Sequence, residues 1–352
     1  MTPRSLPHTL VARLDSAGDV LLQGPAVRAL AAGSSRLTLL CGPRGRAAAE
    51  LLPDVDKVVE FRAEWIDPNP GPVSRPAVEE LLARVERLSP DLAVVLTSFH
   101  QSALPLALLL RLAGVPRIGA ISEDYPGSLL DVRHRVDEDL HEVERSLSLA
   151  EAMGFPLPPG DDGRLRIVRR ASLPPAAAAQ RPYVVVHPGA SVPSRAWSPE
   201  RHRQLVELLA ARGRRVVVTG AADEVELTGR VAGGLSGVLD LGGRTPWPAL
   251  AEVLAAAEAV VVGNTGPAHL AAAVGTPVVS LFSPVVPAWR WRPWSVPHLL
   301  LGRQDAPCAG TRARLCPVAG HPCLEAVTTE EVAAAVEALA PAARRQAAEV
   351  EA

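Results

Sequence analysis

The residues from Asn264 to His269 place a hydroxyl, a glycine turn and an imidazole between a predicted strand and a predicted helix. Gly266 can turn the chain sharply, and Pro267 suits the first helical position, where no amide donor is needed. The first turn and the dipole of such a helix favour an anion at the carboxyl end of a parallel strand. This pattern predicts a phosphate site. The alternative is that Asn264 and Thr265 only cap the helix and that His269 is a packing residue.

The surrounding segment, residues 259–284, reads AVVVGNTGPAHLAAAVGTPVVSLFSP. It resembles the signature D-[TS]-G-x-x-H-x-A-A-A-x-x-x-P-x-x-x-L-F-G of glycosyltransferase family 9, the heptosyltransferases, which transfer heptose from ADP-heptose to lipopolysaccharide. Asn264 stands where the family has Asp, and Ser283 stands where it has Gly. The resemblance implies that Asn264, Thr265, Gly266 and His269 bind a nucleotide-sugar donor.

Near the start of the chain, residues 11–32 read VARLDSAGDVLLQGPAVRALAA. They predict a strand, a polar turn and a helix over 20–32 with Pro25 in its first half, which is how a Rossmann-like domain opens. The turn lacks the G-x-G-x-x-G pattern and is similar to the family's R-x-D-x-x-G-D-x-x-x-x-x-P-A opening. In the family, the carboxylate that matches Asp19 faces the interdomain cleft and is the proposed general base. A helix N-cap would by itself also explain an Asp at position 19.

A third motif, HPGASVPSRAW, follows the predicted strand at 183–186. It resembles the family element H-P-G-A-S-x-x-x-K-x-W, whose lysine contacts the donor phosphates. Arg195 takes the place of that lysine, and its planar guanidinium can hold two phosphate oxygens at once. The resemblance implies donor-binding roles for Gly189, Ser191, Ser194 and Arg195. A solvated surface arginine is the alternative for Arg195.

Two further turns carry weaker signals. Glu224, with Asp223 as the alternate, follows a predicted strand, where an acidic side chain can accept hydrogen bonds from a ribose. A charge in the first turn of a helix explains the same residue. Thr245 is expected to flank the nucleotide base of the donor. His100 and Gln101 follow the strand at 92–96, where they either contact the acceptor or cap the next helix.

The cysteines leave a structural metal open as an alternative. Cys308, Cys316 and Cys323 lie close to His321 in sequence, and Cys₃His sites for zinc are known. The spacing lacks paired C-x-x-C knuckles, so we assign no metal site here. Cys41 stands alone and is expected in the core.

The composition fits two ordinary α/β domains. The chain has 352 residues and a net charge of −2, which gives no pull toward nucleic acid. We find neither a signal-peptide pattern nor an apolar run long enough to span a membrane, so a cytoplasmic protein is expected. A Pro- and Ala-rich linker over 156–180 separates residues 1–172 from residues 173–352. Residues 133–153 predict one long amphipathic helix.

Taken together, the resemblance implies a GT-B fold, in which two Rossmann-like domains face each other across a cleft. It implies an inverting glycosyltransferase that moves heptose or a similar sugar from a nucleotide diphosphate-sugar, ADP-linked, to a hydroxyl of a glycan or glycolipid acceptor. The first domain would hold the acceptor, at the inner face of the membrane, and the second the donor. We expect a monomer that requires no metal or other cofactor. The alternatives are a nucleotide-sugar epimerase of GT-B fold and an inactive nucleotide-sugar-binding protein.

Overall fold

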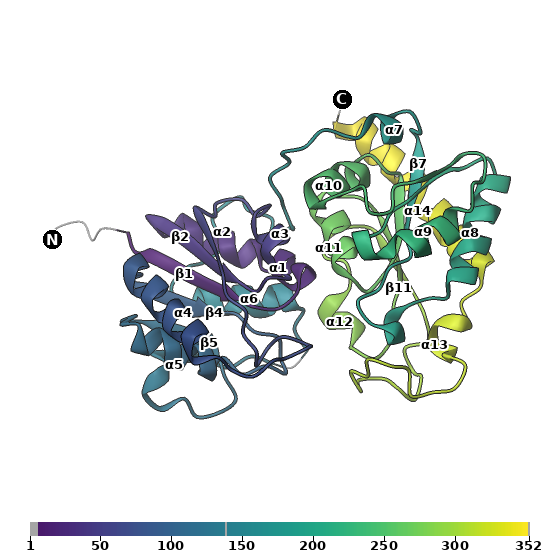
Figure 1. The fold of residues 1–352 in the computed structure, drawn as a ribbon. Coiled ribbons are helices and arrows are strands. Elements are labelled where there is room, and N and C mark those ends of the chain that lie inside the picture. Colours follow the sequence, from purple (N-terminus) through teal and green to yellow (C-terminus); the bar gives the residue numbers. More distant parts are fainter. Residues whose placement is uncertain (1–5, 138, 351–352) are drawn as a thin grey trace. The chain divides into compact units, whose positions relative to one another are not determined.

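The structure, a computed structural model, describes residues 6–137 and 139–350, with side chains described as far as residue 340. By its internal contacts the chain divides into unit 1, Met1–Val168, and unit 2, Arg169–Ala352. Figure 1 shows unit 1 in purple and blue and unit 2 in teal to yellow. The division between the units lies inside the segment 156–180, which the sequence assigns to a linker.

The sheet of unit 1 has the order β3-β2-β1-β4-β5-β6, and every neighbouring pair is parallel. Its strands are β1 His8–Arg13, β2 Arg36–Cys41, β3 Lys57–Glu60, β4 Leu92–Val95, β5 Ile118–Ile121 and β6 Val132–His134. The central strand β1 is buried from its second residue onward, and β4 is buried throughout. Continuous apolar runs of this kind are typical of parallel strands that helices cover on both faces.

The sheet of unit 2 has the order β12-β11-β10-β7-β8-β9 and is also parallel throughout. Its strands are β7 Tyr183–His187, β8 Arg215–Val218, β9 Val238–Asp240, β10 Ala259–Gly263, β11 Val278–Leu281 and β12 His298–Leu301. Counted along each unit, both sheets follow the same order, 3-2-1-4-5-6. The order changes direction between β1 and β4 in unit 1 and between β7 and β10 in unit 2, and such switch points are where open α/β sheets bind ligands.

Helices cover the sheets. In unit 1 they are α1 Ala17–Leu22, α2 Gly24–Ala32, α3 Arg46–Ala49, α4 Arg75–Leu88, α5 Leu104–Leu112 and α6 Glu142–Ala152, with the short η1 Gly127–Leu129. In unit 2 they are α7 Pro175–Ala178, η2 Pro193–Arg195, α8 Pro199–Ala211, η3 Ala222–Glu224, α9 Val225–Ala232, α10 Trp247–Ala255, α11 Gly266–Ala273, α12 Ala288–Trp291, α13 Pro322–Glu325 and α14 Thr329–Val350. Helix α2 packs on α6, and α4 packs on α5 (Figure 1). Within the described residues, none of the helices is both long enough and apolar enough to cross a membrane.

Two helix predictions were wrong, and both corrections matter for the site. The helix expected over 20–32 is two helices, α1 and α2, separated at Gln23. Pro25 lies in the first turn of α2, since proline has no N–H for an intrahelical bond and is tolerated there. The helix expected over 133–153 is the edge strand β6 followed by α6. His141 and Glu144 form a capping box that starts α6 at Glu142, nine residues after the start of the expected helix.

Candidate active site

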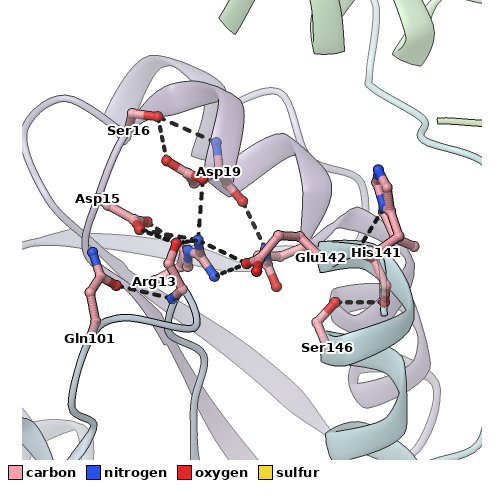
Figure 2. Close-up of polar contacts among 11 residues, drawn as sticks. Arg13, Asp15, Ser16, Asp19, Gln101, His141, Glu142 and Ser146 are labelled. Atoms are coloured by element: carbon pink, nitrogen blue, oxygen red, sulfur yellow. Dashed lines mark hydrogen bonds and ion pairs between the residues drawn. The ribbon is translucent and has the colours of Figure 1, made fainter. Parts of the chain in front are cut away.

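Side chains from three segments of unit 1 meet at its switch point. Arg13 is the last residue of β1, Ser98 follows β4, and Glu142 is the first residue of α6. Figure 2 shows Asp15, Asp19 and Glu142 turned toward the guanidinium of Arg13. We refer to Arg13, Asp15, Asp19, Ser98 and Glu142 as the Arg13 cluster.

Asp15 is the principal partner of Arg13. Arg13 Nε donates to Asp15 Oδ1 at 2.6 Å, and Nη2 donates to Oδ2 at 3.0 Å. Nη2 also donates to Ser98 Oγ at 2.7 Å, and that hydroxyl donates to Asp15 Oδ2 at 3.2 Å. A bidentate pair of this kind holds a guanidinium in one orientation.

Asp19 lies in the first turn of α1 and presents the most exposed carboxylate of the cluster. Its side chain is 19% exposed, against 12% for Asp15 and 1% for Glu142. Arg13 Nη2 lies 3.3 Å from Oδ1, and Ser16 Oγ donates to Oδ2 at 2.6 Å. Ser16, and not Asp19, is the N-cap of α1, so the capping alternative for Asp19 was wrong. A carboxylate that two fixed donors orient and that keeps access to solvent is suited to accept a proton from a bound hydroxyl.

Glu142, which is 129 residues from Arg13 in the sequence, is the third carboxylate of the cluster. Its Oε2 lies 3.4 Å from both Nη1 and Nη2 of Arg13, while its Oε1 is buried without a hydrogen-bond partner among the described residues. Burial raises the pKa of Glu142 to about 7, against the lowering effect of Arg13. Burial also raises the pKa of Asp15. For Arg13, burial alone would lower the pKa, but the three carboxylates outweigh it and raise it above its usual range.

The two acceptor-side residues differ in their placement. Gln101 joins the edge of the Arg13 cluster, because its Oε1 accepts a hydrogen bond from the backbone N–H of Ser98 at 3.0 Å (Figure 2). His100 is exposed, and its ring stacks edge-on against Phe99 at a centroid distance of 5.3 Å. Helix α5 begins at Leu104, with Ala103 as its N-cap, so neither residue is the N-cap of the next helix.

In unit 2, the turn after β10 has the geometry of an anion site. Thr265 is the N-cap of α11, but its side chain makes no capping hydrogen bond, and Asn264 is only 5% exposed. Thr265 is therefore the N-cap by position, as the capping alternative expects, whereas Asn264 is not the N-cap of α11. Of the first three residues of α11, Pro267 has no N–H and the Ala268 N–H donates to Thr265 O at 3.1 Å, so the Gly266 amide is the one of the three that can face a ligand. His269 is buried in α11.

Arg195 and Ser194 belong to η2, which lies beside the end of β10. A Cβ atom on Gly263 would lie 3.3 Å from the carbonyl oxygen of Arg195, so the Arg195 backbone passes close to the Asn264 turn. Ser194 is fully buried, and its Oγ donates to the carbonyl oxygen of Ala313 at 2.5 Å. The structure therefore brings Arg195 to the turn, and Ser194 ties η2 to the loop at 313–314.

Glu224 has a local partner. Its Oε2 accepts a hydrogen bond from the Ala221 N–H at 2.8 Å, and burial raises its pKa. A Cβ atom on Gly189 would lie 2.1 Å from Glu224 Oε1, so the absence of a side chain at position 189 makes room for this carboxylate. His187 Nε2 lies 3.9 Å from Glu224 Oε2, but burial lowers the His187 pKa to about 4, so the pair is not ionic at neutral pH.

The remaining predicted donor residues lie on loops at the same edge of the sheet. Ser191 is exposed in the loop between β7 and η2. Thr245 is half-buried in the loop after the edge strand β9. That loop is joined to the loop after β8 by the hydrogen bond from the Gly243 N–H to Gly220 O, at 3.0 Å. The site residues of unit 2 thus follow β7, β8, β9 and β10.

The cysteine-rich segment does not form a metal site in the described part of the chain. No group of three or more His, Cys, Asp and Glu side chains there is arranged to hold a metal ion. Cys316 Sγ donates to Val318 O at 3.3 Å, and His321 Nε2 lies 3.1 Å from Ser194 O. Cys308 and Cys323 are buried as free thiols.

The sequence analysis missed four members of the Arg13 cluster. Arg13 and Asp15 are the R and D of the R-x-D-x-x-G-D opening, so a signal for them was present. Ser98 adjoins the predicted acceptor-side turn. Glu142 carries no local signal, because 129 residues separate it from Arg13.

Comparisons with known proteins point to one family. The model of glycosyltransferase family 9 (heptosyltransferase) matches residues 81–320, more than half of the 352-residue chain. The chain is similar to lipopolysaccharide heptosyltransferase 1 of Pseudomonas aeruginosa, with 34% identity over 225 residues, 61% of each protein. It is 30% identical over 166 residues to lipopolysaccharide heptosyltransferase 3 of Escherichia coli, covering 44% of this chain and 47% of that protein. The match thus covers about three fifths of the first relative's length, and less of the second.

Solved structures resemble the whole chain. A glycosyltransferase of family 9 from Veillonella parvula has a TM-score of 0.76 at 16% identity and covers 96% of this chain and 98% of its own. The ADP-heptose heptosyltransferase II of E. coli has a TM-score of 0.72 at 20% identity, with coverages of 95% and 98%. An E. coli heptosyltransferase with ADP-2-deoxy-2-fluoro heptose has a TM-score of 0.68 at 21% identity, with coverages of 94% and 99%. The predicted fold class, GT-B, is confirmed.

Proposed function

The chain belongs to glycosyltransferase family 9, and from this premise we propose that it is an inverting glycosyltransferase that uses a nucleotide diphosphate-sugar. The observation that carries the proposal is the pair of switch-point sites. Unit 1 presents an oriented, partly exposed carboxylate, Asp19, and unit 2 presents a glycine turn at a helix N-terminus with Arg195 beside it. A base for a hydroxyl and a cradle for a diphosphate are the two elements that inverting transfer without a metal needs.

In the proposed reaction, Asp19 accepts the proton of an acceptor hydroxyl while the hydroxyl oxygen attacks the anomeric carbon. The bond from that carbon to the diphosphate oxygen breaks, the diphosphate leaves with the electron pair, and the configuration at carbon inverts. Arg13 and Ser16 hold the two oxygens of Asp19 in place, at 3.3 and 2.6 Å. Arg195 and the Gly266 amide stabilise the charge that develops on the departing diphosphate.

We extend the proposal to the substrates. One of the similar solved structures is an ADP-heptose heptosyltransferase, and another contains ADP-2-deoxy-2-fluoro heptose. Both support ADP-heptose or a related ADP-sugar as the donor in unit 2. The curated relatives are lipopolysaccharide heptosyltransferases, which supports a glycan or glycolipid acceptor, with His100 and Gln101 of unit 1 beside it. The extended proposal is a cytoplasmic monomer that works at the inner face of a membrane. No observation favours the epimerase or the inactive binding protein.

The test is acceptor-dependent release of the nucleoside diphosphate. The purified chain is incubated with ADP-, GDP- and UDP-linked sugars, with and without lipopolysaccharide-core acceptors, and both ADP and glycosylated acceptor are quantified. We expect ADP and glycosylated acceptor in equal amounts, and only when both substrates are present. A change in the sugar without an acceptor would point to an epimerase instead. Donor binding by calorimetry without any turnover would point to a binding protein.

A further inference from the structure

Glu142 is a buried acid that the proposed reaction does not use. It is 1% exposed, one of its carboxyl oxygens faces Arg13, and the other has no hydrogen-bond partner among the described residues. We propose that Glu142 is a positioning residue which, through the shared guanidinium of Arg13, sets the basicity of Asp19. This inference rests on the proposed function, in which Asp19 is the base.

The geometry couples the three acids through one cation. The Nη2 atom of Arg13 lies within 3.4 Å of oxygens of Asp15, Asp19 and Glu142, at 3.0, 3.3 and 3.4 Å. A single positive charge cannot balance three negative charges in a buried site, where uncompensated charge is strongly unfavourable. A proton is therefore expected on one of the three acids over part of the neutral pH range.

The contacts identify Glu142 as the acid that holds this proton. Burial raises the pKa of Asp15 too, but Asp15 accepts two short hydrogen bonds from Arg13 and one from Ser98, which oppose that rise by favouring its charged form. Asp19 accepts from Ser16 and reaches solvent. Glu142 has only the two contacts of 3.4 Å, and burial raises its pKa to about 7. Its charge therefore changes near neutrality, while the other two carboxylates have better partners.

The charge on Glu142 determines how strongly Arg13 acts on Asp19. When Glu142 is neutral, the positive charge of Arg13 is shared by Asp15 and Asp19 alone, which lowers the proton affinity of Asp19. When Glu142 is ionised, it adds a negative charge beside the same guanidinium, and the proton affinity of Asp19 rises. Asp19 becomes a stronger base above the pKa of Glu142, which should raise the rate of proton transfer.

The other described charges around α6 are few. Arg145 on the same helix lowers the pKa of Glu142, and Glu144 is exposed, with Oε2 accepting from the His141 N–H. On β6, burial and Arg145 lower the pKa of His134, whose Nε2 lies 3.1 Å from Ser148 Oγ. On α2, Arg28 is paired with Asp161 at 2.6 Å. Arg145 therefore acts on Glu142 in addition to Arg13, whereas Glu144, His134 and Arg28 have the partners given above, so Arg13 is the cation that Glu142 shares with Asp15 and Asp19.

The first test measures Asp19 directly and needs no turnover. The full chain is labelled with ¹³C at the Asp carboxyl carbons, the Asp19 signal is assigned with Asp19→Asn, and its shift is followed from pH 4 to 9. In the parent we expect an inflection near pH 7 from Glu142, in addition to the ionisation of Asp19 itself. Glu142→Gln, which is nearly isosteric, should remove that inflection, and the control Glu144→Gln should keep it. An inflection that persists in Glu142→Gln, or is absent from the parent, would overturn the proposal.

Two further readouts extend the test. Because the Glu142 pKa is raised on folding, its favourable contribution to stability is complete below its ordinary pKa of 4.5 and is lost as the pH rises through about 7. The melting temperature of Glu142→Gln should therefore rise relative to the parent between pH 5 and pH 8, and a constant difference would count against the proposal.

In the pH profile of kcat/KM, Glu142→Gln should lose a several-fold rise near pH 7, and an unchanged profile would overturn the proposal. A parent with the NMR inflection but no sugar transfer would support the role of Glu142 and refute the proposed function.

Discussion

Arg13 Nη2 lies 3.3 Å from Asp19 Oδ1, although the same guanidinium makes its shortest hydrogen bond, at 2.6 Å, to Asp15. Asp15 thus fixes the orientation of Arg13, and Arg13 in turn orients Asp19. Asp19, the carboxylate that remains most open to solvent, lies farther from Arg13 than Asp15 does. This division of roles gives separate predictions for the base and for the cation.

Asp19→Asn should abolish most of the transfer while leaving the protein folded. Asparagine keeps the size of the side chain but cannot accept the proton, and a positioned base contributes about 10²–10⁴-fold in rate. We expect kcat to fall in that range, with the affinity for ADP unchanged by calorimetry. Asp305→Asn, which changes an exposed acid of unit 2, is the control and should retain parental turnover. Activity of Asp19→Asn within a few-fold of the parent would remove Asp19 from the role of base.

Arg13→Met should destabilise the protein strongly. Arg13 is 1% exposed, and its removal leaves Asp15, Asp19 and Glu142 without their common cation. Removing one partner of a buried ion pair costs about 3–5 kcal/mol in the free energy of unfolding. Urea unfolding at pH 8 measures this loss, and the exposed Arg75→Met should change stability by less than about 0.5 kcal/mol. A loss of stability in Arg13→Met as small as that in Arg75→Met would show that Arg13 does not stabilise the three carboxylates.

The same substitution predicts a pH effect. Burial raises the pKa of Asp15 and Glu142, so protonation relieves the uncompensated charge once Arg13 is absent. The loss in the free energy of unfolding that Arg13→Met causes should therefore shrink as the pH falls from 8 to 5. A deficit that is independent of pH would indicate that lost packing, and not lost charge, destabilises the variant.

Arg195→Ala should weaken binding of ADP far more than binding of adenosine. The motivation is the position of the Arg195 backbone next to the Asn264 turn, from which we propose that the guanidinium reaches the diphosphate. A hydrogen bond to a charged group contributes about 1.5–3 kcal/mol, so the Kd for ADP should rise about tenfold to a hundredfold. Calorimetry with both ligands measures the difference, and Arg230→Ala, with an exposed side chain, is the control. Equal ADP affinity in the parent and Arg195→Ala would exclude this residue from the site.

Asn264→Leu should impair donor binding, whereas Asn264→Asp should be tolerated because Asp is the usual residue at this position of the family signature. Asn264 is 5% exposed, and its side chain forms no hydrogen bond with a described residue, so a ligand is the partner we expect for it. Loss of that hydrogen bond should raise the Kd for ADP about tenfold. Calorimetry on both variants decides the question. An unchanged Kd in Asn264→Leu would make the residue part of the scaffold only.

Gly189→Ala should destabilise the protein through Glu224. The added Cβ atom would lie 2.1 Å from Glu224 Oε1, so the carboxylate must move and lose its hydrogen bond from the Ala221 N–H. Loss of a helix-cap interaction costs about 1 kcal/mol. In a Glu224→Ala background the same substitution should cost little, and a double-mutant cycle by urea unfolding measures the coupling. Additive losses would show that Gly189 is required for another reason.

Much of the fold and part of the site follow from local sequence. The valine run of β10, the N-T-G-P turn and the Pro-started α11 are specified within a few residues, since backbone geometry and burial of a parallel strand depend on near neighbours. The same holds for Asp19, which follows a strand in a short motif. For these elements a residue's position in the fold can be predicted from its place in the pattern.

Only the tertiary structure decided which acids share Arg13. Glu142 is 129 residues from Arg13, and its segment resembles one long helix locally, although the structure has the strand β6 and the helix α6 there. Glu224 stays a predicted ribose ligand, and only the structure shows that Gly189 leaves room for its carboxylate, which accepts a hydrogen bond from the Ala221 N–H. Charge interactions and close packing act through space and not along the chain. The partners of a buried carboxylate are therefore determined by the packing of α6 and the sheet, which no local pattern contains.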